Sequence, residues 1–245
     1  MDYSDYISGA SKNNFYFKAK QGLVKIMVSK LSKSGPDLSV LSVGTGTGEE
    51  LGHLKDLGRV CALDINKDAL DLIPGGFCEK ILQDICYNSF PDSSFDLIFC
   101  FDALEHIQDD DLAISEIKRI LKPSGLVIFT VPAISSIFSR HDRSLGHFRR
   151  YDLSVIKDKF SGLKRKYLGF WFFFLFAFVY LKRTIDNRSS SQDISCSSPD
   201  SVMNLPPLLN SIFYKVLHLE NLIIKSNLSF PFGLTICGIY QKQKE

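Results

Sequence analysis

The chain has 245 residues, 45% of them hydrophobic, which suits one large α/β domain or two small ones and excludes a disordered or fibrous protein. Its 29 Lys plus Arg nearly balance 27 Asp plus Glu, so no general positive field exists for a polyanion and nucleic acid is not expected as a partner. The six cysteines form no C-x-x-C pair and residues 1–6 are acidic where a signal peptide is basic and apolar, so we expect reduced thiols in a cytoplasmic protein.

Short apolar runs alternate with helical patterns after a helical cap within residues 1–37. Strands are predicted at residues 38–43, 59–64, 78–83, 95–101 and 126–131. Between the last two, residues 111–121 carry apolar side chains at helical spacing and end at a Lys-Pro-Ser-Gly sequence. Continuous apolar strands separated by helices are typical of parallel sheets buried on both faces. We predict an α/β, Rossmann-like, doubly wound, mainly parallel seven-stranded sheet with helices on both faces.

The C-terminal half adds a polar helix and an apolar insertion to this pattern. The predicted segments are a helix at 152–160, an aromatic-rich run at 168–181, a serine-rich loop at 188–201, a helix at 207–224 and a last strand at 232–241. The run at 168–181 is shorter than the ~20 residues that a helix needs to span a bilayer. We therefore divide one domain into a cap (1–37), a cofactor-binding core (38–135) and an acceptor loop with an apolar lid and last strands (136–245).

The most informative segment is the glycine turn in VLSVGTGTG, residues 40–48, where a predicted strand runs into a helix. Glycines allow a sharp turn and close approach of a ligand. Glu49 occupies the place of the third glycine in a dinucleotide fingerprint, and its carboxylate would repel a pyrophosphate. Asp64 ends the next strand, 20 residues after Gly44, where an acid can accept hydrogen bonds from a ribose diol. These residues predict a ligand with a ribose and no diphosphate; a plain tight turn is the alternative.

Five segments together resemble class I S-adenosylmethionine-dependent methyltransferases of the broad small-molecule group. They are VLSVGTGTG (40–48), ALDIN (62–66), LQDI (82–85), FPDSSFDLIFCFDALEHI (90–107) and LKPSGLVIFTVP (121–132). The glycine motif alone is a weak signal, whereas the ordered set is a strong one. The resemblance covers roughly the first 135 residues and implies S-adenosyl-L-methionine as the cofactor and methyl transfer as the activity.

The resemblance also implies a set of cofactor-binding residues. They are Gly44, Thr45, Gly46, Gly48, Asp64, Ile65, Asp84, Ile85 and Phe101. By this resemblance Asp64 takes the ribose hydroxyls, Asp84 accepts from the adenine amino group, and two isoleucines flank the base. One departure is Ser42, which stands where the family usually has an acid that helps to hold the cofactor's amino group. His106 is interpreted as part of the pocket wall or as a helix cap rather than as a base.

The sequence RHDRSLGHFRRY, residues 140–151, follows the fifth predicted strand and is expected over the acceptor side of the pocket. It resembles an S-x-H-D-x-x-x-G-H-x-R-R-Y element of a methyltransferase subgroup that also has an aromatic start like FYFKAK (15–20) and an apolar insertion. Members of this subgroup often accompany polysaccharide or lipid-linked sugar biosynthesis, which implies an acceptor of that kind.

Three interpretations of this element remain open. As an anion clamp, it would bind acceptor through Arg143, Arg149, Arg150 and Tyr151. Alternatively, the arginines pair with acids such as those at 109–111 while the aromatic residues pack. A metal site of His141, Asp142 and His147 is disfavoured because flanking arginines repel a cation, so no metal is expected. His141 and His147 are the candidate catalytic bases for a hydroxyl acceptor.

The sequence predicts a methyltransferase that acts on a small-molecule or lipid-linked or glycan acceptor, with oxygen favoured as the methylated atom. The alternatives are a protein or nucleic-acid methyltransferase and a scaffold that binds the cofactor without turnover. Residues 168–181 and 207–224 have two interpretations. In the first, the first half of the run at 168–181 is the sixth strand and the segments form core or homodimer contact. In the second, they form a lid that contacts a membrane surface, aided by flanking basic residues, or binds an acyl or prenyl chain.

Overall fold

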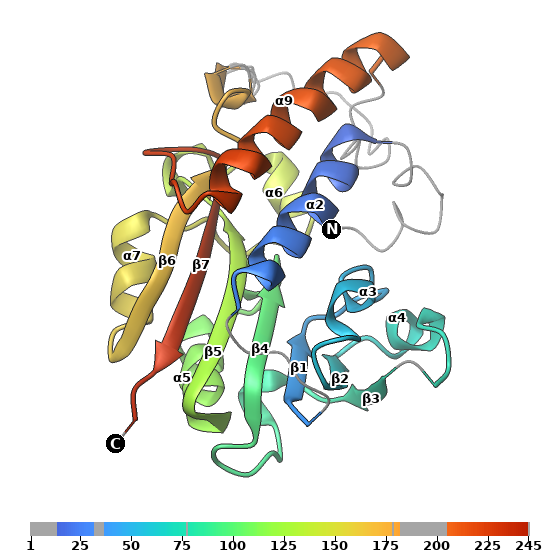
Figure 1. Ribbon diagram of the computed structural model, residues 1–245, viewed down its shortest axis with the longest axis vertical. Coiled ribbons are helices and arrows are strands. Elements are labelled where there is room, and N and C mark those ends of the chain that lie inside the picture. Colours follow the sequence, from blue (N-terminus) through green and yellow to red (C-terminus); the bar gives the residue numbers. More distant parts are fainter. Residues whose placement is uncertain (1–13, 32–36, 77, 178, 182–204, 245) are drawn as a thin grey trace.

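The computed structural model describes residues 14–31, 37–76, 78–177, 179–181 and 205–244. A seven-stranded sheet in the order β3-β2-β1-β4-β5-β7-β6 forms its centre (Figure 1). The strands are β1 (Ser39–Val43), β2 (Arg59–Asp64), β3 (Glu79–Leu82), β4 (Phe95–Phe101), β5 (Leu121–Pro132), β6 (Leu163–Trp171) and β7 (Thr235–Lys242). All neighbours pair in parallel except β7, which is antiparallel to both β5 and β6. The predicted Rossmann-like, mainly parallel sheet is confirmed.

Six of the seven strands lie where the apolar runs predict them, within a few residues at each end except at the start of β5. β6 differs more, because it begins at Leu163 and includes the basic residues 164–166, which the sequence places outside the strand as a flank. These three side chains are exposed on a strand that pairs only with β7 in the described part of the chain. Charged side chains are common on such edge strands, since they discourage further pairing. The predicted loop at 188–201 lies outside the described residues.

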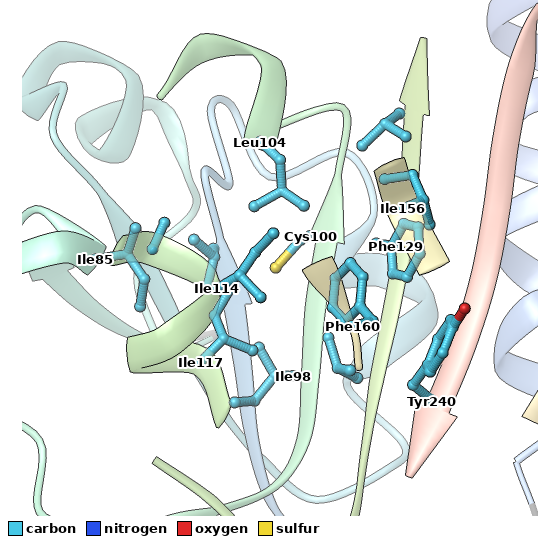
Figure 2. Close-up of a cluster of buried hydrophobic side chains, with 14 of the residues drawn as sticks. Ile85, Ile98, Cys100, Leu104, Ile114, Ile117, Phe129, Ile156, Phe160 and Tyr240 are labelled. Atoms are coloured by element: carbon cyan, nitrogen blue, oxygen red, sulfur yellow. The ribbon is translucent and has the colours of Figure 1, made fainter. Parts of the chain in front are cut away.

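Two hydrophobic clusters cover the two faces of the sheet. Successive β4 residues alternate between them: Ile98 and Cys100 belong to one cluster, and Leu97 and Phe99 to the other. The first cluster includes the apolar faces of α5 (Asp110–Ile120) and α7 (Leu153–Lys159), with Phe129 stacked on Phe160 at 4.4 Å between ring centroids (Figure 2). Burial on both faces explains the continuous apolar sequence of the central strands.

The opposite face carries helices from both ends of the described chain. These are α2 (Phe15–Ser29), α3 (Leu51–Leu54), α4 (Lys67–Leu72) and α9 (Pro207–Lys225). α2 and α9 lie side by side (Figure 1), and two hydrogen bonds join them: Asn221 Nδ2 donates to the Ala19 carbonyl at 2.8 Å, and the Phe15 amide donates to Asn210 Oδ1 at 2.9 Å. α2 is thus held by the C-terminal helix as well as by the sheet.

α9 forms the described part of the predicted apolar lid together with the segment after β6. Its inner face buries Leu217 and Ile224, and Glu220 accepts hydrogen bonds from the backbone amides of residues 173 and 174 at 3.0 and 2.8 Å. Its outer face exposes apolar side chains, namely Leu208, Leu209, Ile212, Leu219 and Leu222. No helix among the described residues is both long and apolar enough to traverse a bilayer.

Candidate active site

A cavity of about 520 Å³ opens at the carboxyl ends of β1, β2 and β4. β1 lies between β2 and β4. The chain continues from β1 to β2 but from β4 to β5, so the connections that leave β1 and β4 at this edge run in opposite directions. Such a switch point is where open α/β sheets bind ligands, because diverging loops leave a crevice. The predicted cofactor residues line this cavity with the exception of Gly48.

The glycine turn after β1 forms the floor of the cavity. Gly44 and Gly46 have φ angles of 65° and 54°, in the left-handed region that favours glycine. A Cβ on Gly44 would lie 2.6 Å from the Ala103 Cβ, whereas a Cβ on Gly46 would meet nothing within 4 Å and would protrude into open space. The turn therefore leaves room for a ligand at Gly46. Gly48 serves packing instead, since a Cβ there would lie 2.8 Å from Leu51.

Asp64 is fixed beside this turn at the end of β2. Its carboxylate accepts hydrogen bonds from the Gly46 amide at 2.7 Å and the Asn66 amide at 2.9 Å. These donors hold the carboxylate at the cavity and leave lone pairs for further donors. The adjacent Ile65 is 73% exposed, an apolar surface that the flat face of a base would cover. Asp84, on the same wall, accepts from the Cys86 amide at 2.8 Å.

A carboxylate lies next to Ser42 although position 42 itself is not an acid. Glu50 lines the cavity and accepts a hydrogen bond from the Ser42 hydroxyl at 2.8 Å. Burial raises the pKa of Glu50 to about 7, and the adjacent Glu49 also has a raised pKa because of burial. No ion pair to a lysine, arginine or histidine within the described part of the chain neutralises either carboxylate. The pair can therefore accept a cationic group of a ligand.

α2 contributes a buried lysine to the same cavity. Lys20 is 5% exposed, and its Nζ lies 2.5 Å from Asp102 Oδ2 and 3.0 Å from Thr130 Oγ1. Burial alone would raise the pKa of Asp102, but the charge and the hydrogen bond of Lys20 outweigh it and hold that pKa below its usual value. Asp102 has a φ of 49°, a strained angle that directs the chain away from β4 at the cavity. Lys20 is absent from the predicted site, although it lies within the quoted FYFKAK sequence.

The basic element at 140–151 is folded largely into the protein in this structure. Arg150 donates to Asp142 at 2.7 Å and to the Ala133 carbonyl at 3.0 Å, Arg149 pairs with Asp110, and the Tyr151 hydroxyl donates to Asp110 at 2.9 Å. Arg143 lies over the Phe138 ring, outside the cavity. The predicted pairing of arginines with acids is observed. An anion clamp stays a prediction, and an anionic acceptor would have to compete with these carboxylates.

The predicted bases do not line the cavity. His141 lies in α6 (Arg140–Ser144). His147, whose side chain is 6% exposed, lies with its ring centroid 4.7 Å from that of His106. His106 itself does line the cavity, as its interpretation as a wall residue predicts. Burial lowers the pKa of His106 to about 4, so the ring is neutral at pH 7. His106 is therefore the histidine of the described chain that a ligand can reach from the cavity.

Tyr151→Phe is expected to destabilise the protein without weakening cofactor binding. The change leaves Asp110 and the Leu104 carbonyl without a buried hydroxyl donor, at a cost of about 1–2 kcal/mol in the free energy of unfolding measured in urea. Tyr87→Phe is the matched control, because Tyr87 is 79% exposed and should change stability little. Weaker binding of S-adenosylmethionine by the Tyr151 variant at unchanged stability would contradict a structural role.

The central strands of the seven-stranded sheet are parallel, a glycine turn at their carboxyl edge is open to a ligand, and an acid is fixed at the end of the next strand. These features define a nucleotide-binding type of α/β domain. Comparison with known proteins gives its class. Residues 41–129 match the family model described as a methyltransferase domain. These residues form a class I S-adenosylmethionine-dependent methyltransferase domain, an enzyme domain whose cofactor is S-adenosylmethionine.

Two curated relatives and one solved structure illustrate the similarity. The chain is 31% identical over 118 residues to the ubiquinone/menaquinone biosynthesis C-methyltransferase UbiE of Saccharophagus degradans, covering 42% of this chain and 47% of the relative. It is 35% identical over 101 residues to the malonyl-[acyl-carrier protein] O-methyltransferase of Yersinia pestis, covering 40% and 38%. The chain thus spans less than half the length of these relatives.

The structural similarity extends over the whole chain. A chain in the complex of the Haloferax volcanii Trm112 methyltransferase activator with a methyltransferase aligns with a TM-score of 0.63 at 16% identity, covering 99% of this chain and 97% of that chain. At this identity the similarity concerns the fold. It includes the sheet edge where the cavity lies.

Proposed function

We propose that the protein transfers a methyl group from S-adenosylmethionine to a small-molecule or lipid-linked or glycan acceptor, with oxygen as the methylated atom. The observation that carries the proposal is the carboxylate of Asp64, held by the Gly46 amide beside a turn that is open at Gly46. The residues present fit this cofactor, since the cavity offers an acid for a diol, an exposed apolar side chain for a base and carboxylates for a cation.

The chain's own residues would bind and align rather than react. Asp64 would accept hydrogen bonds from both ribose hydroxyls, and Asp84 would accept one from the adenine amino group. Glu50, beside Ser42, would bind the ammonium group of the cofactor. When bound, the cofactor supplies a methyl group on a positively charged sulfur. Transfer by in-line displacement asks the protein mainly to align the acceptor and to exclude water. The wall formed by His106, Ile107 and Phe148 would do so on the acceptor side.

Oxygen is proposed as the methylated atom because the reachable histidine is a neutral ring that can accept a hydrogen bond from a hydroxyl. The proposal of a lipid-linked acceptor is supported by the apolar outer face of α9, whose exposed side chains include Leu208 at 73% and Leu219 at 51%. Contact of that face with a membrane surface would bring such an acceptor to the enzyme. A second copy of the chain covering the same face is the alternative.

The proposed function is tested by incubating the full chain with methyl-labelled S-adenosylmethionine and a fractionated cell extract. We expect label in the lipid or small-metabolite fraction and none with the Asp64→Ala variant. Treatment of the labelled product with reagents that cleave methyl esters or ethers then identifies the bond to oxygen. Label confined to protein or nucleic acid, or cofactor binding without any label transfer, would overturn the proposal.

Glu50→Gln is expected to act in opposite directions on stability and on cofactor binding. The folded pKa of Glu50, about 7, lies above its unfolded value, so ionisation costs folding free energy as pH rises from the unfolded to the folded pKa. The variant removes that cost, so at pH 8 the cofactor-free protein should unfold at a higher temperature than wild type. It also removes the carboxylate proposed for the ammonium group, so the Kd for S-adenosylmethionine should rise by at least about tenfold.

The matched control for this prediction is Glu79→Gln, because Glu79 is exposed on β3 outside the cavity. Calorimetry in buffers of different ionisation enthalpy adds a second measurement. If Glu50 becomes ionised against the ammonium group, wild type should release a proton on binding near pH 6.5, and the Gln variant should not. Equal proton release by wild type and the Gln variant would show that Glu50 does not contact the ammonium group of the cofactor.

Membrane contact is tested by flotation with anionic liposomes. A double change of Leu208 and Ile212 to aspartate on the outer face of α9 should abolish flotation, because buried apolar area supplies most of the attraction. The control is Lys215→Asp, an exposed position on the same helix that changes charge without removing an apolar side chain. Absence of flotation by the wild type at low salt, with a dimer in sedimentation, would favour the second copy.

A further inference from the structure

We propose that Glu105, His106 and His147 bind a divalent metal ion of the zinc type at the acceptor side of the cavity. Each residue offers one ligand atom, and these atoms lie within 4.8 Å of one another. The sequence brings only two of the three together, since His147 is about forty residues further along the chain. The shared site arises because the Phe148 amide donates to the Glu105 carbonyl at 2.8 Å, which ties the two segments.

The first support is a set of buried polar atoms that lack partners. Glu105 is 1% exposed and its Oε2 has no hydrogen-bond partner. His147 Nε2 also has none, although the side chain is 6% exposed, and Nδ1 has only the Asp142 carboxylate at 3.4 Å. A buried polar atom without a partner costs about 1–3 kcal/mol. Two such atoms facing one cluster call for an explanation. A cation bound between them would give both Glu105 and His147 a partner.

The second support is the chemistry of the ligand set. Two imidazoles and one carboxylate are the protein ligands of many catalytic zinc sites and leave a further position open. Metal bonds of about 2.0–2.2 Å at tetrahedral angles place ligand atoms about 3.3–3.6 Å apart, so binding would draw these side chains together by small rotations. His147 Nδ1 lies 3.4 Å from Asp142 Oδ1. A carboxylate beside one ring nitrogen fixes the tautomer of a ligating histidine and leaves the other nitrogen for the metal.

The third support is the charge around the cluster. The sequence disfavours a bound cation because arginines flank this element. In the structure, however, Arg150 is paired with Asp142 and Arg149 with Asp110. Lys20, on the other side, is paired with Asp102. Each of these three cations has a carboxylate beside it, although Lys159 shares Asp110 with Arg149 and also pairs with Asp111. Glu105 adds a negative charge to the buried cluster when it is ionised. The cluster shares only His147 with the His141, Asp142 and His147 site that the sequence suggests but disfavours.

The location gives the metal a role. His106 and Phe148 line the cavity beside Asp102 and Gly44, so an open coordination position at His106 would face the space for the acceptor. A divalent ion there would bind an acceptor oxygen and lower the pKa of a coordinated hydroxyl, whose proton would pass to water. This role rests on the proposed function, whereas the metal site itself does not.

The test is metal binding by the full chain, measured independently of activity. After removal of metals with a chelator, the protein is titrated with Co²⁺ by visible absorption and with Zn²⁺ by equilibrium dialysis. We expect one ion per chain, a ligand-field spectrum and a raised melting temperature. His106→Gln and His147→Gln should each weaken binding by more than about 100-fold, since even second-shell partners are worth about 10–100-fold.

His218→Gln is the matched control, because His218 is exposed on α9 and stacks only on Tyr214 among the described residues. His106 lies at the cavity wall, so its variant keeps the test valid if the buried His147 variant does not fold. Equal binding by wild type and both cluster variants, or no stoichiometric binding, would overturn the metal site. Cofactor binding by calorimetry in the same samples shows separately whether the proposed function stands.

Discussion

Asp64→Ala is expected to weaken binding of S-adenosylmethionine by at least about 100-fold. The variant loses the two charge-assisted hydrogen bonds that we propose between Asp64 and the ribose. Each is worth about 1.5–3 kcal/mol, and 3 kcal/mol corresponds to about two decades in Kd. It also releases the Gly46 amide, so the glycine turn loses a restraint. The measurement is isothermal titration calorimetry of the cofactor with the purified full chain.

Two further variants make this prediction specific. Asp64→Asn keeps an acceptor for the Gly46 amide but removes the charge, so its Kd should lie between those of wild type and the alanine variant. Asp71→Asn removes an exposed carboxylate that pairs with Lys67 on the surface, and it should leave the Kd unchanged. A wild-type Kd for the alanine variant would show that the ribose does not lie at Asp64.

Lys20→Met is expected to destabilise the protein by about 3 kcal/mol, because it leaves the partly buried carboxylate of Asp102 without its cationic partner. The deficit should be largest near neutral pH. The pKa of Asp102 is depressed in the folded wild type, so the stability from this pair is present above the unfolded pKa and is lost as pH falls through the folded pKa. In urea unfolding the difference between variant and wild type should therefore shrink in acid.

The control for position is Lys25→Met, an exposed lysine on the same helix, which should change stability by less than about 0.5 kcal/mol. The control for mechanism is the double variant Lys20→Met with Asp102→Asn. It removes the unpaired charge and should recover most of the lost stability. A double variant as unstable as the single one would show that packing of the lysine stem, rather than charge, is what the substitution removes.

The position of the glycine turn and of Asp64 at one cavity could be predicted from the sequence because each signal is local. The glycine turn and Asp64 each need only a strand end and a few residues of sequence, and parallel strands bring their carboxyl ends to one edge. The same holds for the sheet, whose buried strands read as apolar runs. Gly48 is the exception, since the motif implies contact with the cofactor and the structure shows packing against Leu51.

Glu50 and Lys20 were less predictable because their partners meet them only in three dimensions. Glu50, directly before α3, accepts a hydrogen bond from Ser42, and nothing in the spacing distinguishes it from Glu49. Lys20 does carry a signal, since it interrupts the apolar face of α2 formed by Ala19, Leu23 and Met27. A lysine at such a position indicates a buried partner, which only the tertiary structure identifies as Asp102.

The pairing of α2 with α9 bears on how the protein matures on the ribosome. Lys20 is among the first described residues to be translated, yet Ala19 beside it is bonded to Asn221, which is translated some 200 residues later. The wall that α2 provides therefore gains its contacts with α9 only after residue 221 has been translated. Until then α2 lacks the two hydrogen bonds to α9 that complete this wall.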